Sequence, residues 1–345
     1  MSWVEQEMRE QSAALARFLD RERDHARDLV PQLFRSDVTY ALIASRGSSG
    51  NAARYAQYLF GSANRLPVAF STPSLYTLYD EPPQLDGAVV IAISQSGESP
   101  DVVSVLAEAR RQGRPTLAIT NEVDSPLART SECVLRLHAG RERAVAATKT
   151  YLNSVAAVAL LSAAIGDDSA RFTALGEVPS WIAQQVERSL EDARPFDRYG
   201  DADGGVVVAR GINLGTAFEI ALKIRELSGV PFEPFSSADL LHGPIAALLP
   251  GRPVLVVAPS GVALDSVRAS IARLRERGAA VVGISDDEDV LAAADVRLPL
   301  VRAVPEWLSP LLAVIPGQAA ALRLATIRGG DVDHPAGLTK VTLTR

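Results

Sequence analysis

The chain repeats itself with a period of 164 residues, and this repeat limits what it can fold into more than any other feature. Three landmarks recur at that offset: Arg46-Gly47 as Arg210-Gly211, Ser96-Gly97 as Ser260-Gly261, and Asp101 as Asp265. A repeat of this length is far longer than a solenoid unit. The sequence therefore predicts two copies of one domain.

Within each copy, short β-rich runs alternate with helical patterns. Such alternation is typical of parallel sheets covered by helices on both faces. We therefore expect an α/β fold of two tandem flavodoxin-like domains, each with a five-stranded parallel sheet flanked by helices. Strands are expected near residues 38–44, 67–71, 87–94, 115–120 and 133–137, and again near 204–209, 231–235, 253–257, 279–284 and 296–299.

The segments outside the two copies are helical or irregular. An N-terminal stretch has apolar residues at helical spacing and is expected to stop before Pro31. A polar helical segment connects the copies, and a tail rich in Pro, Gly and Thr follows the second. The expected divisions are 1–30 (helical arm), 31–165 (first domain), 166–197 (connector), 198–330 (second domain) and 331–345 (tail).

The composition excludes several classes of partner. Lys and Arg total 35 against 41 Asp and Glu, so the net charge of −6 leaves no broad basic surface for nucleic acid. The longest apolar stretch, Val155 to Ile165, is too short to span a bilayer and is expected to be a buried helix. The acidic N-terminus is unlike a signal peptide, so a cytoplasmic location is expected.

The cysteine and the histidines give no metal-binding pattern. Cys133, the single cysteine, cannot form an internal disulfide and is interpreted as an inert core thiol. The four histidines do not form a His-x-x-x-His pair with a nearby acid. No Walker loop, dinucleotide-binding glycine fingerprint or nucleophile elbow is present. We therefore expect neither a metal nor a cofactor.

Only three of the 35 basic residues are lysines, namely Lys149, Lys223 and Lys340. Arginine can replace lysine at most exposed sites. Only lysine supplies a compact amine that can change its protonation state or form a Schiff base. The bias marks these three positions as functional candidates, although lysines could also survive by chance in an arginine-rich chain.

Hydroxyl-rich segments follow the first and third strands of the first copy, where ligands bind in sheets of this kind. They are Ser45-Arg-Gly-Ser-Ser-Gly and Ser94-Gln-Ser-Gly-Glu-Ser, and Ala146-Ala-Thr-Lys-Thr opens the last helix. Hydroxyls and helix N-terminal amides can hold a phosphate monoester. Serine N-capping would explain any one segment, but three together favour phosphate binding. The second copy has the poorer Ala258-Pro-Ser-Gly, so one phosphate site is expected.

The second copy carries different side chains. Glu219, Lys223 and Glu226 are spaced by four and three residues, which places them on one face of a helix. On spacing alone, an exposed salt-bridged face is the better interpretation. His242 stands beside a Gly-Pro turn, and taken alone it is more simply a structural histidine.

These segments resemble the sugar isomerase (SIS) family. Within it they are similar to the isomerase half of glucosamine-6-phosphate synthases and, more closely, to stand-alone glucosamine-6-phosphate deaminases of SIS type. The resemblance covers nearly the whole chain in order, including the 16-residue spacing from Glu226 to His242. Its motifs are Glu5-Gln-Glu, Ser45-Arg-Gly-Ser-Ser, Ser94-Gln-Ser-Gly-Glu-Ser-Pro-Asp, Ala144-Val-Ala-Ala-Thr-Lys, Glu219-Ile-Ala-Leu-Lys-Ile-Arg-Glu, Phe235-Ser-Ser-Ala, Leu241-His-Gly-Pro and Pro335-Ala-Gly-Leu-Thr-Lys-Val-Thr.

The chain departs from this family pattern at several points. Arg46 stands where synthases usually have cysteine, Ala147 where they often have serine, and Arg225 where they have lysine. The glutaminase domain with its N-terminal cysteine nucleophile has no counterpart here. Glutamine is therefore not the expected nitrogen source.

The resemblance and the residue chemistry together imply roles for the candidate residues. Glu226 would move a proton between C2 and C1, with Lys223 stabilising charge on the substrate oxygen. His242 would open the sugar ring, and the resemblance implies that it serves the neighbouring subunit of a homodimer. Lys340 would act as a neutral amine that forms a Schiff base at C2 and expels ammonia. The expected substrate and phosphate contacts are Gly47, Ser48, Ser49, Ser94, Gln95, Ser96, Ser99, Val145 and Thr148.

The predicted function is conversion of glucosamine 6-phosphate to fructose 6-phosphate and ammonia. One alternative is another SIS isomerase or deaminase, acting on galactosamine 6-phosphate or a ketosamine phosphate, or an ammonia-dependent synthesis. A second alternative is a non-catalytic phosphosugar sensor. A sensor would not need the Glu, His and Lys set, and no helix-turn-helix segment precedes residue 38. Sugar epimer, direction and effectors stay open.

Overall fold

The computed structural model describes residues 1–340, which fall into two compact units. The first-repeat unit comprises Ala13–Glu142, Lys149–Glu177 and the tail from Thr339. The second-repeat unit comprises Met1–Ser12, Arg143–Thr148 and Val178–Leu338. Two long helices contribute residues to both units, α1 (Trp3–Leu33) and α7 (Ser169–Asp192). Of the expected tail, residues 341–345 lie outside the described part of the chain.

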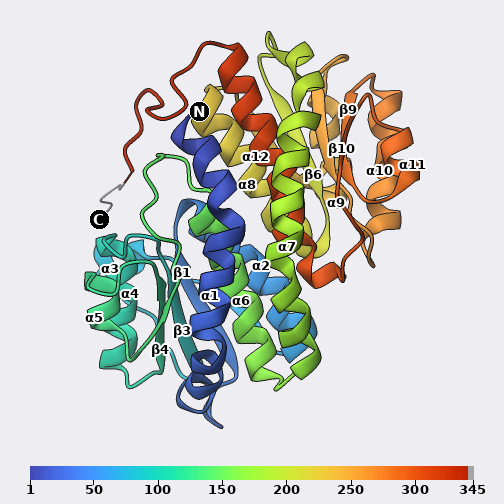
Figure 1. Ribbon diagram of the computed structural model, residues 1–345. Coiled ribbons are helices and arrows are strands. Elements are labelled where there is room, and N and C mark those ends of the chain that lie inside the picture. Colours follow the sequence, from blue (N-terminus) through green and yellow to red (C-terminus); the bar gives the residue numbers. More distant parts are fainter. Residues whose placement is uncertain (341–345) are drawn as a thin grey trace. The chain divides into compact units, whose positions relative to one another are not determined.

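The first-repeat unit is built on a five-stranded sheet in the order β2-β1-β3-β4-β5, with every pair parallel. The central strand β3 is buried at all of its positions, because helices cover both faces. Figure 1 shows α3, α4 and α5 on one face, with α2 packed on α6 on the other. The elements are β1 (Tyr40–Ser45), α2 (Gly47–Asn64), β2 (Val68–Phe70), α3 (Ser74–Thr77), β3 (Ala88–Ile93), α4 (Pro100–Arg111), β4 (Thr116–Thr120), α5 (Pro126–Thr130), β5 (Cys133–Arg136) and α6 (Lys149–Ile165).

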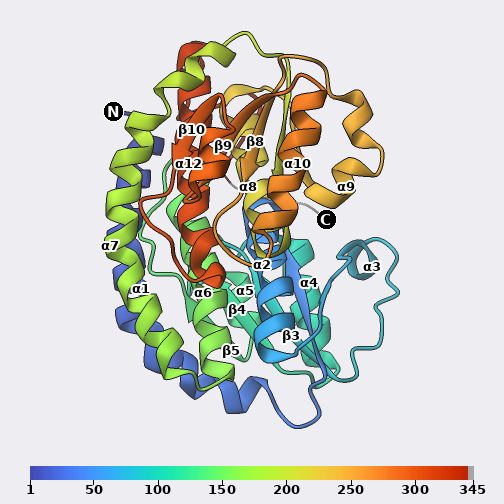
Figure 2. The same ribbon diagram turned by 90° about the vertical axis from the view of Figure 1, so that its right-hand side faces the viewer.

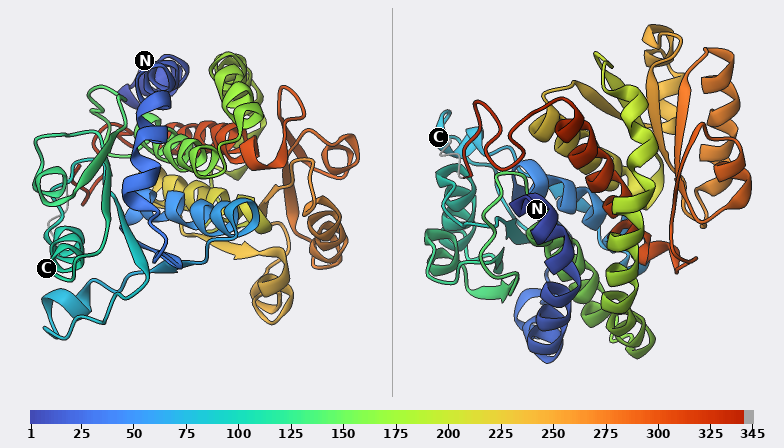
Figure 3. Two further views of the ribbon diagram at one scale, coloured as in Figure 1. Left: turned by 90° about the horizontal axis from the view of Figure 1, so that it is seen from below. Right: turned by 45° about the horizontal axis from the view of Figure 1, so that its top comes forward.

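The second-repeat unit has the same topology, with a parallel sheet in the order β10-β9-β8-β6-β7. Figure 1 shows α8 and α12 on one face of this sheet and α10 and α11 on the other, and Figure 3 shows the yellow α8 and the red α12 side by side. Its elements are η1 (Arg194–Tyr199), β6 (Gly205–Ala209), η2 (Gly211–Asn213), α8 (Leu214–Ser228), β7 (Phe232–Ser236), α9 (Ser237–Leu241), η3 (Pro244–Ala247), β8 (Pro253–Val257), α10 (Leu264–Glu276), β9 (Ala280–Ser285), α11 (Glu288–Ala292), β10 (Val296–Pro299), η4 (Glu306–Leu308) and α12 (Ser309–Ile327).

A glycine allows α8 and α12 to pack closely in the second-repeat unit. A Cβ atom added to Gly317 would lie 2.3 Å from Cγ1 of Ile220, which is closer than two carbon atoms can approach. The segment Glu306–Ile327 is apolar and long enough to cross a membrane, but 83% of its apolar window is buried inside the structure. That burial is typical of a core helix in a globular domain.

The predicted fold class is confirmed, since each repeat contains a five-stranded parallel sheet flanked by helices. All ten predicted strands are present, and the apolar stretch from Val155 to Ile165 is part of the buried helix α6. The predicted end of the first helix is wrong, because α1 continues through Pro31 to Leu33. Proline removes only one backbone donor there, in the last turn, where the helix is about to end.

The single cysteine is buried on β5. Burial, together with the nearby Glu132 carboxylate, raises the pKa of the Cys133 thiol. A thiol that stays protonated is a poor nucleophile, which agrees with the interpretation of Cys133 as an inert core residue.

Candidate functional site

Strands β1 and β3 are neighbours at the centre of the first sheet, and the chain leaves them toward opposite sides. This is the switch point at which sheets of this type bind ligands, beyond the carboxyl ends of the strands. The segments that follow these strands are Ser45–Gly50, which includes the first turn of α2, and the loop Ser94–Ser99, and we call them together the candidate phosphate site. They hold the predicted contacts Gly47, Ser48, Ser49, Ser94, Gln95, Ser96 and Ser99.

Backbone hydrogen bonds fix the second of these loops. The N–H of Gly97 donates to Oγ of Ser94 over 3.1 Å, and the carbonyl of Gln95 accepts from the N–H of Asn121 over 3.2 Å. Gly97 has a φ of +64°, and a Cβ there would lie 2.1 Å from Oγ of Ser125. Only glycine fits this position, so the loop is held rigidly against the start of α5.

The helices that begin at the candidate phosphate site have no side-chain N-cap in the described structure. Arg46 and Ser99 occupy the N-cap positions of α2 and α4, and neither side chain accepts a capping hydrogen bond. By contrast, Ser125 caps α5 and Ser236 caps α9. Serine capping therefore does not explain the hydroxyls at α4, and the uncapped N-termini suit an anionic ligand.

The equivalent loop of the second repeat is occupied by carboxylates. The N–H of Ser260 donates to Oδ1 of Asp286 over 2.8 Å, and the N–H of Ala263 donates to Oε1 of Glu306 over 3.3 Å. The Glu306 side chain also fills the space beside Gly261, where a Cβ would lie 2.4 Å from its Cδ. Two carboxylates at this position would repel a phosphate, which argues against a second phosphate site.

Val145 and Thr148 lie in the loop that precedes α6. Thr148 is buried and Val145 is partly exposed. The loop is held by Glu7 of α1, whose carboxylate accepts hydrogen bonds from the N–H groups of Arg143 and Ala144. Glu7 itself is buried, so the helical arm fixes the backbone of a predicted substrate-binding loop.

Glu219, Lys223 and Glu226 lie on one face of α8, as their spacing predicts, but that face is not exposed. The side chains of Glu219 and Lys223 are 0% and 1% exposed, whereas Glu226 keeps 23% exposed. Nζ of Lys223 lies 3.4 Å from Oε1 of Glu219 and forms an ion pair with Glu226. The exposed salt-bridged face that spacing alone favoured is therefore wrong. An ammonium this deeply buried requires its carboxylate partners.

His242 is the C-cap residue of α9, a short helix that follows the edge strand β7 and lies beside α10 in Figure 2. Its backbone N–H donates to the carbonyl of Asp239 over 3.1 Å, while the residue itself is exposed. Gly243 follows with a φ of +138°, which only glycine adopts readily. The imidazole therefore stands at the surface of its unit.

The tail lysine rests on a buried carboxylate of the first-repeat unit. Nζ of Lys340 donates to Oε2 of Glu142 over 2.7 Å, and the Glu142 side chain is 0% exposed. The same carboxylate accepts the N–H and the hydroxyl of Thr150, over 3.1 and 2.6 Å. Because Thr150 lies in the first turn of α6, the Glu142 carboxylate also stabilises the N-terminus of that helix.

Lys149 has a structural position. Its side chain is buried, and Nζ donates to the carbonyl of Arg141 over 2.7 Å. The contact supports the loop that carries Glu142. The scarcity of lysine therefore marked two residues with predicted catalytic roles, Lys223 and Lys340, and one residue, Lys149, that supports a loop.

Sequence reasoning did not assign a role to three carboxylates. Glu142, Glu7 and Asp101 each bind a predicted functional residue or its loop. Asp101 gave a signal as a repeat landmark and Glu7 as part of the motif Glu5-Gln-Glu, whereas Glu142 gave none. Within residues 1–340, no group of three or more His, Cys, Asp or Glu side chains is placed to hold a metal ion.

Comparison with known proteins identifies the domain family of the two repeats. The family model of the SIS domain matches residues 36–164 and again 201–328. The isomerizing glutamine–fructose-6-phosphate aminotransferase of Streptomyces coelicolor is 36% identical over 329 residues, which cover 90% of this chain and 53% of that protein. The chain thus spans about half the length of this curated relative.

The chain also superposes on solved structures. The C-terminal domain of the glucosamine-fructose-6-phosphate aminotransferase of Francisella tularensis superposes with a TM-score of 0.87 at 25% identity, covering 96% of this chain and 98% of that chain. The glucosamine-6-phosphate deaminase of Thermotoga maritima superposes with a TM-score of 0.79 at 23% identity, covering 99% and 100%. The latter likeness concerns the fold alone.

The contact between Glu142 and Lys340 predicts how the tail responds to substitution. Endoproteinase Lys-C cuts after lysine, and Lys149 and Lys223 are buried, which leaves Lys340 as the accessible target. Glu142→Ala should speed cleavage after Lys340 by about tenfold, because a hydrogen bond to a charged group contributes roughly 1.5–3 kcal/mol. Mass spectrometry of the native digest measures the rate.

Thr150→Val is the matched control for this experiment. It removes the hydroxyl bond to the same carboxylate and leaves the contact with Lys340 in place. Cleavage should stay near the wild-type rate. Equal rates for Glu142→Ala and wild type would contradict a tail held by Glu142.

Proposed function

Because the chain belongs to the SIS family, with one SIS domain in each repeat, we propose that it deaminates and isomerises glucosamine 6-phosphate to fructose 6-phosphate and ammonia. The observation that carries the proposal is the arrangement on α8. There a buried lysine pairs two carboxylates and leaves only Glu226 partly exposed. A carboxylate next to a cation, with access to a ligand, suits the transfer of a proton between adjacent carbons.

The first-repeat unit supplies the phosphate contacts in this proposal. The uncapped N-termini of α2 and α4, with the hydroxyls of Ser48, Ser96 and Ser99, would receive the 6-phosphate. The phosphate is remote from C1 and C2, so its binding energy acts mainly on affinity. Gly47, Ser49, Ser94, Gln95, Val145 and Thr148 complete the proposed substrate contacts.

The reaction can be divided among the remaining residues with its atoms in balance. His242 moves a proton to the ring oxygen and opens the pyranose. Glu226 removes the proton from C2 and returns it to C1, while a second proton passes from the amino nitrogen to O1, and the amino aldose becomes a ketimine. Lys340 then adds to C2 as a neutral amine and ammonia leaves. Water hydrolyses the resulting Schiff base, releasing fructose 6-phosphate and the free amine.

The proposal also gives Glu142 a role. Lys340 forms an ion pair with the Glu142 carboxylate and would have to lose a proton before it attacks C2. The carboxylate already accepts a hydrogen bond from Nζ, so we assign it as the acceptor of that proton. The departing nitrogen needs a proton in turn, so one proton can pass from Lys340 through Glu142 without a net change.

The test of the proposal is ammonia release from a panel of amino-sugar 6-phosphates. We expect activity with glucosamine 6-phosphate and little with the galactosamine epimer. Glu226→Gln should lower kcat by a factor of about 10² or more, because the amide is not a base. If the protein turned over only galactosamine 6-phosphate or a ketosamine phosphate, that compound would be assigned as the substrate instead. Binding of a phosphosugar without any turnover would favour a sensor.

Lys340 can be tested by trapping. Borohydride reduction in the presence of fructose 6-phosphate should attach the sugar through a stable secondary amine, and peptide mapping should place it on Lys340. Lys340→Arg keeps the charge on Glu142 but cannot form the adduct, so it should remain unlabelled. An adduct on Lys149 or Lys223 would transfer the covalent role to that residue.

We also propose a homodimer with shared sites. The support is the exposed position of His242 at the surface of its unit. Inactive His242→Ala and inactive Glu226→Gln proteins, mixed under conditions of subunit exchange, should recover up to about a quarter of total wild-type activity, since about half of the dimers are mixed and each has one complete site. No recovery in verified heterodimers would assign each site to one chain.

A charged phosphosugar does not cross membranes unaided, which supports a cytoplasmic location.

A further inference from the structure

Arg46 connects the two helices that begin at the candidate phosphate site. Its Nε and Nη2 each lie 2.8 Å from Oδ2 of Asp101, so both nitrogens share one carboxylate oxygen. Arg46 occupies the N-cap position of α2, and Asp101 lies in the first turn of α4. The ion pair therefore spans the switch point between β1 and β3.

The two partners differ in exposure. The Asp101 side chain is 1% exposed, whereas 54% of the Arg46 side chain is exposed. Oδ1 of Asp101 accepts the N–H of Val102 over 2.9 Å, which fixes the carboxylate in the turn. A buried carboxylate thus stands beside the candidate phosphate site, and the half-exposed guanidinium lies between it and the solvent.

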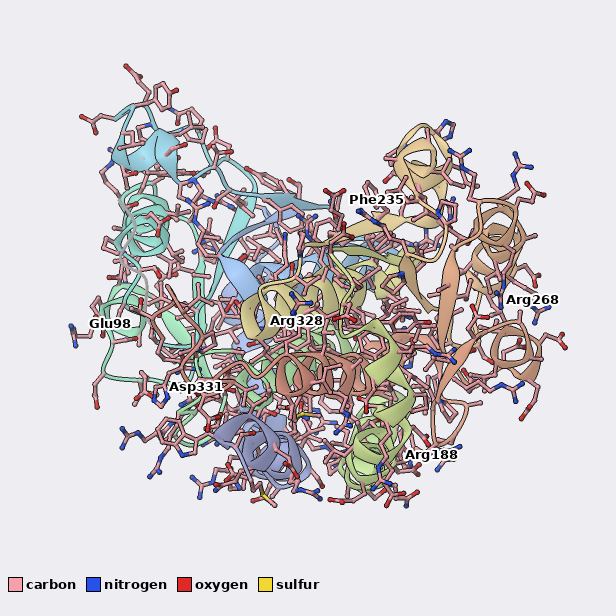
Figure 4. The ribbon with its side chains drawn as sticks, turned by 90° about the horizontal axis from the view of Figure 1, so that it is seen from above. Glu98, Arg188, Phe235, Arg268, Arg328 and Asp331 are labelled. Carbon is pink, nitrogen blue, oxygen red and sulfur yellow. The ribbon has the colours of Figure 1, made fainter. Side chains whose placement is uncertain are left out.

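The second repeat provides an internal comparison. Arg210 and Asp265 occupy the positions equivalent to Arg46 and Asp101, but Asp265 has a side chain that is 95% exposed and lies 3.8 Å from Arg268. Figure 4 shows Arg268 on the outer side of its unit. The arginine and the aspartate are thus kept in both repeats, whereas their pairing is seen at the hydroxyl-rich loops of the first.

We propose that Arg46 is the counter-charge of Asp101, which makes the site accept a phosphate dianion, and that its exposed edge contributes a direct contact with that phosphate. The inference rests on the proposed function for the kind of ligand. A phosphate monoester carries nearly two negative charges at neutral pH. Asp101 alone would repel it, and the Arg46 pair removes this repulsion. A planar guanidinium can contact a carboxylate with one edge and a phosphate with another.

The experiment measures binding of fructose 6-phosphate by calorimetry, so it does not depend on turnover. Arg46→Gln should weaken binding at least about thirtyfold, because it removes a charge-assisted contact and exposes the Asp101 charge. Arg46→Lys keeps a cation but loses the second edge of the guanidinium, so it should bind more weakly than wild type and more tightly than Arg46→Gln. Arg210→Gln is the matched control in the second repeat and should not change affinity.

The double variant Arg46→Gln/Asp101→Asn separates electrostatics from lost packing. It removes both charges, so it should bind at least about fivefold more tightly than Arg46→Gln alone. Added salt should reduce the loss of affinity in Arg46→Gln, since screening weakens the repulsion between Asp101 and the phosphate. Thermal unfolding of each variant verifies that it is folded.

Each result has one meaning. If wild type does not bind fructose 6-phosphate, the proposed function fails. If wild type binds and Arg46→Gln binds equally well, the role of Arg46 is overturned while the function stands. The counter-charge role would be overturned if the double variant bound fructose 6-phosphate no more tightly than Arg46→Gln. It would also be overturned if Arg46→Lys bound as weakly as Arg46→Gln. In either case Arg46 would have only a structural role.

Discussion

Buried carboxylates, together with the partly exposed Glu226, hold the cations on which the proposed chemistry depends. Glu142 binds Lys340, Glu219 and Glu226 bind Lys223, and Asp101 binds Arg46. Removing a charge from water is costly, so each buried acid keeps its partner close. These pairs place the amine, the ammonium and the guanidinium more precisely than surface ion pairs could, because exposed pairs contribute little and move freely. The positions of these cations follow from the burial of their acids.

The two repeats show how one fold can be used in two ways. Both have the same strand order and the same loops after the first and third strands. In the first repeat those loops keep hydroxyls and uncapped helix N-termini. In the second, Asp286 and Glu306 already accept the loop N–H groups, so an added anion would meet two negative charges. In the second repeat, the proposed acid and base groups lie instead on α8, where Lys223 is buried and Glu226 is partly exposed.

The sequence predicted the strands better than the site. Each strand of a covered parallel sheet is a short apolar run between helices, and such runs are visible in the residues themselves. The end of α1 was wrong because proline in a last turn removes too little to stop a helix. Glu142 and Glu7 were missed because their partners, Lys340 and the loop at Arg143, are far away in sequence, and only the fold brings them together. The burial of Glu219 has the same cause.

The contact between Lys340 and Glu142 also limits how the amine can work. The carboxylate accepts two hydrogen bonds from Thr150 whether or not the amine is charged, so it stays in place when the proton moves. In the proposed mechanism, a fixed acceptor would let Lys340 give up its proton without rearrangement of α6. The transfer would replace the ion pair between Lys340 and Glu142 by a hydrogen bond between neutral groups, which holds the amine less strongly. The proton transfer that makes the amine nucleophilic would thus also weaken its attachment to Glu142.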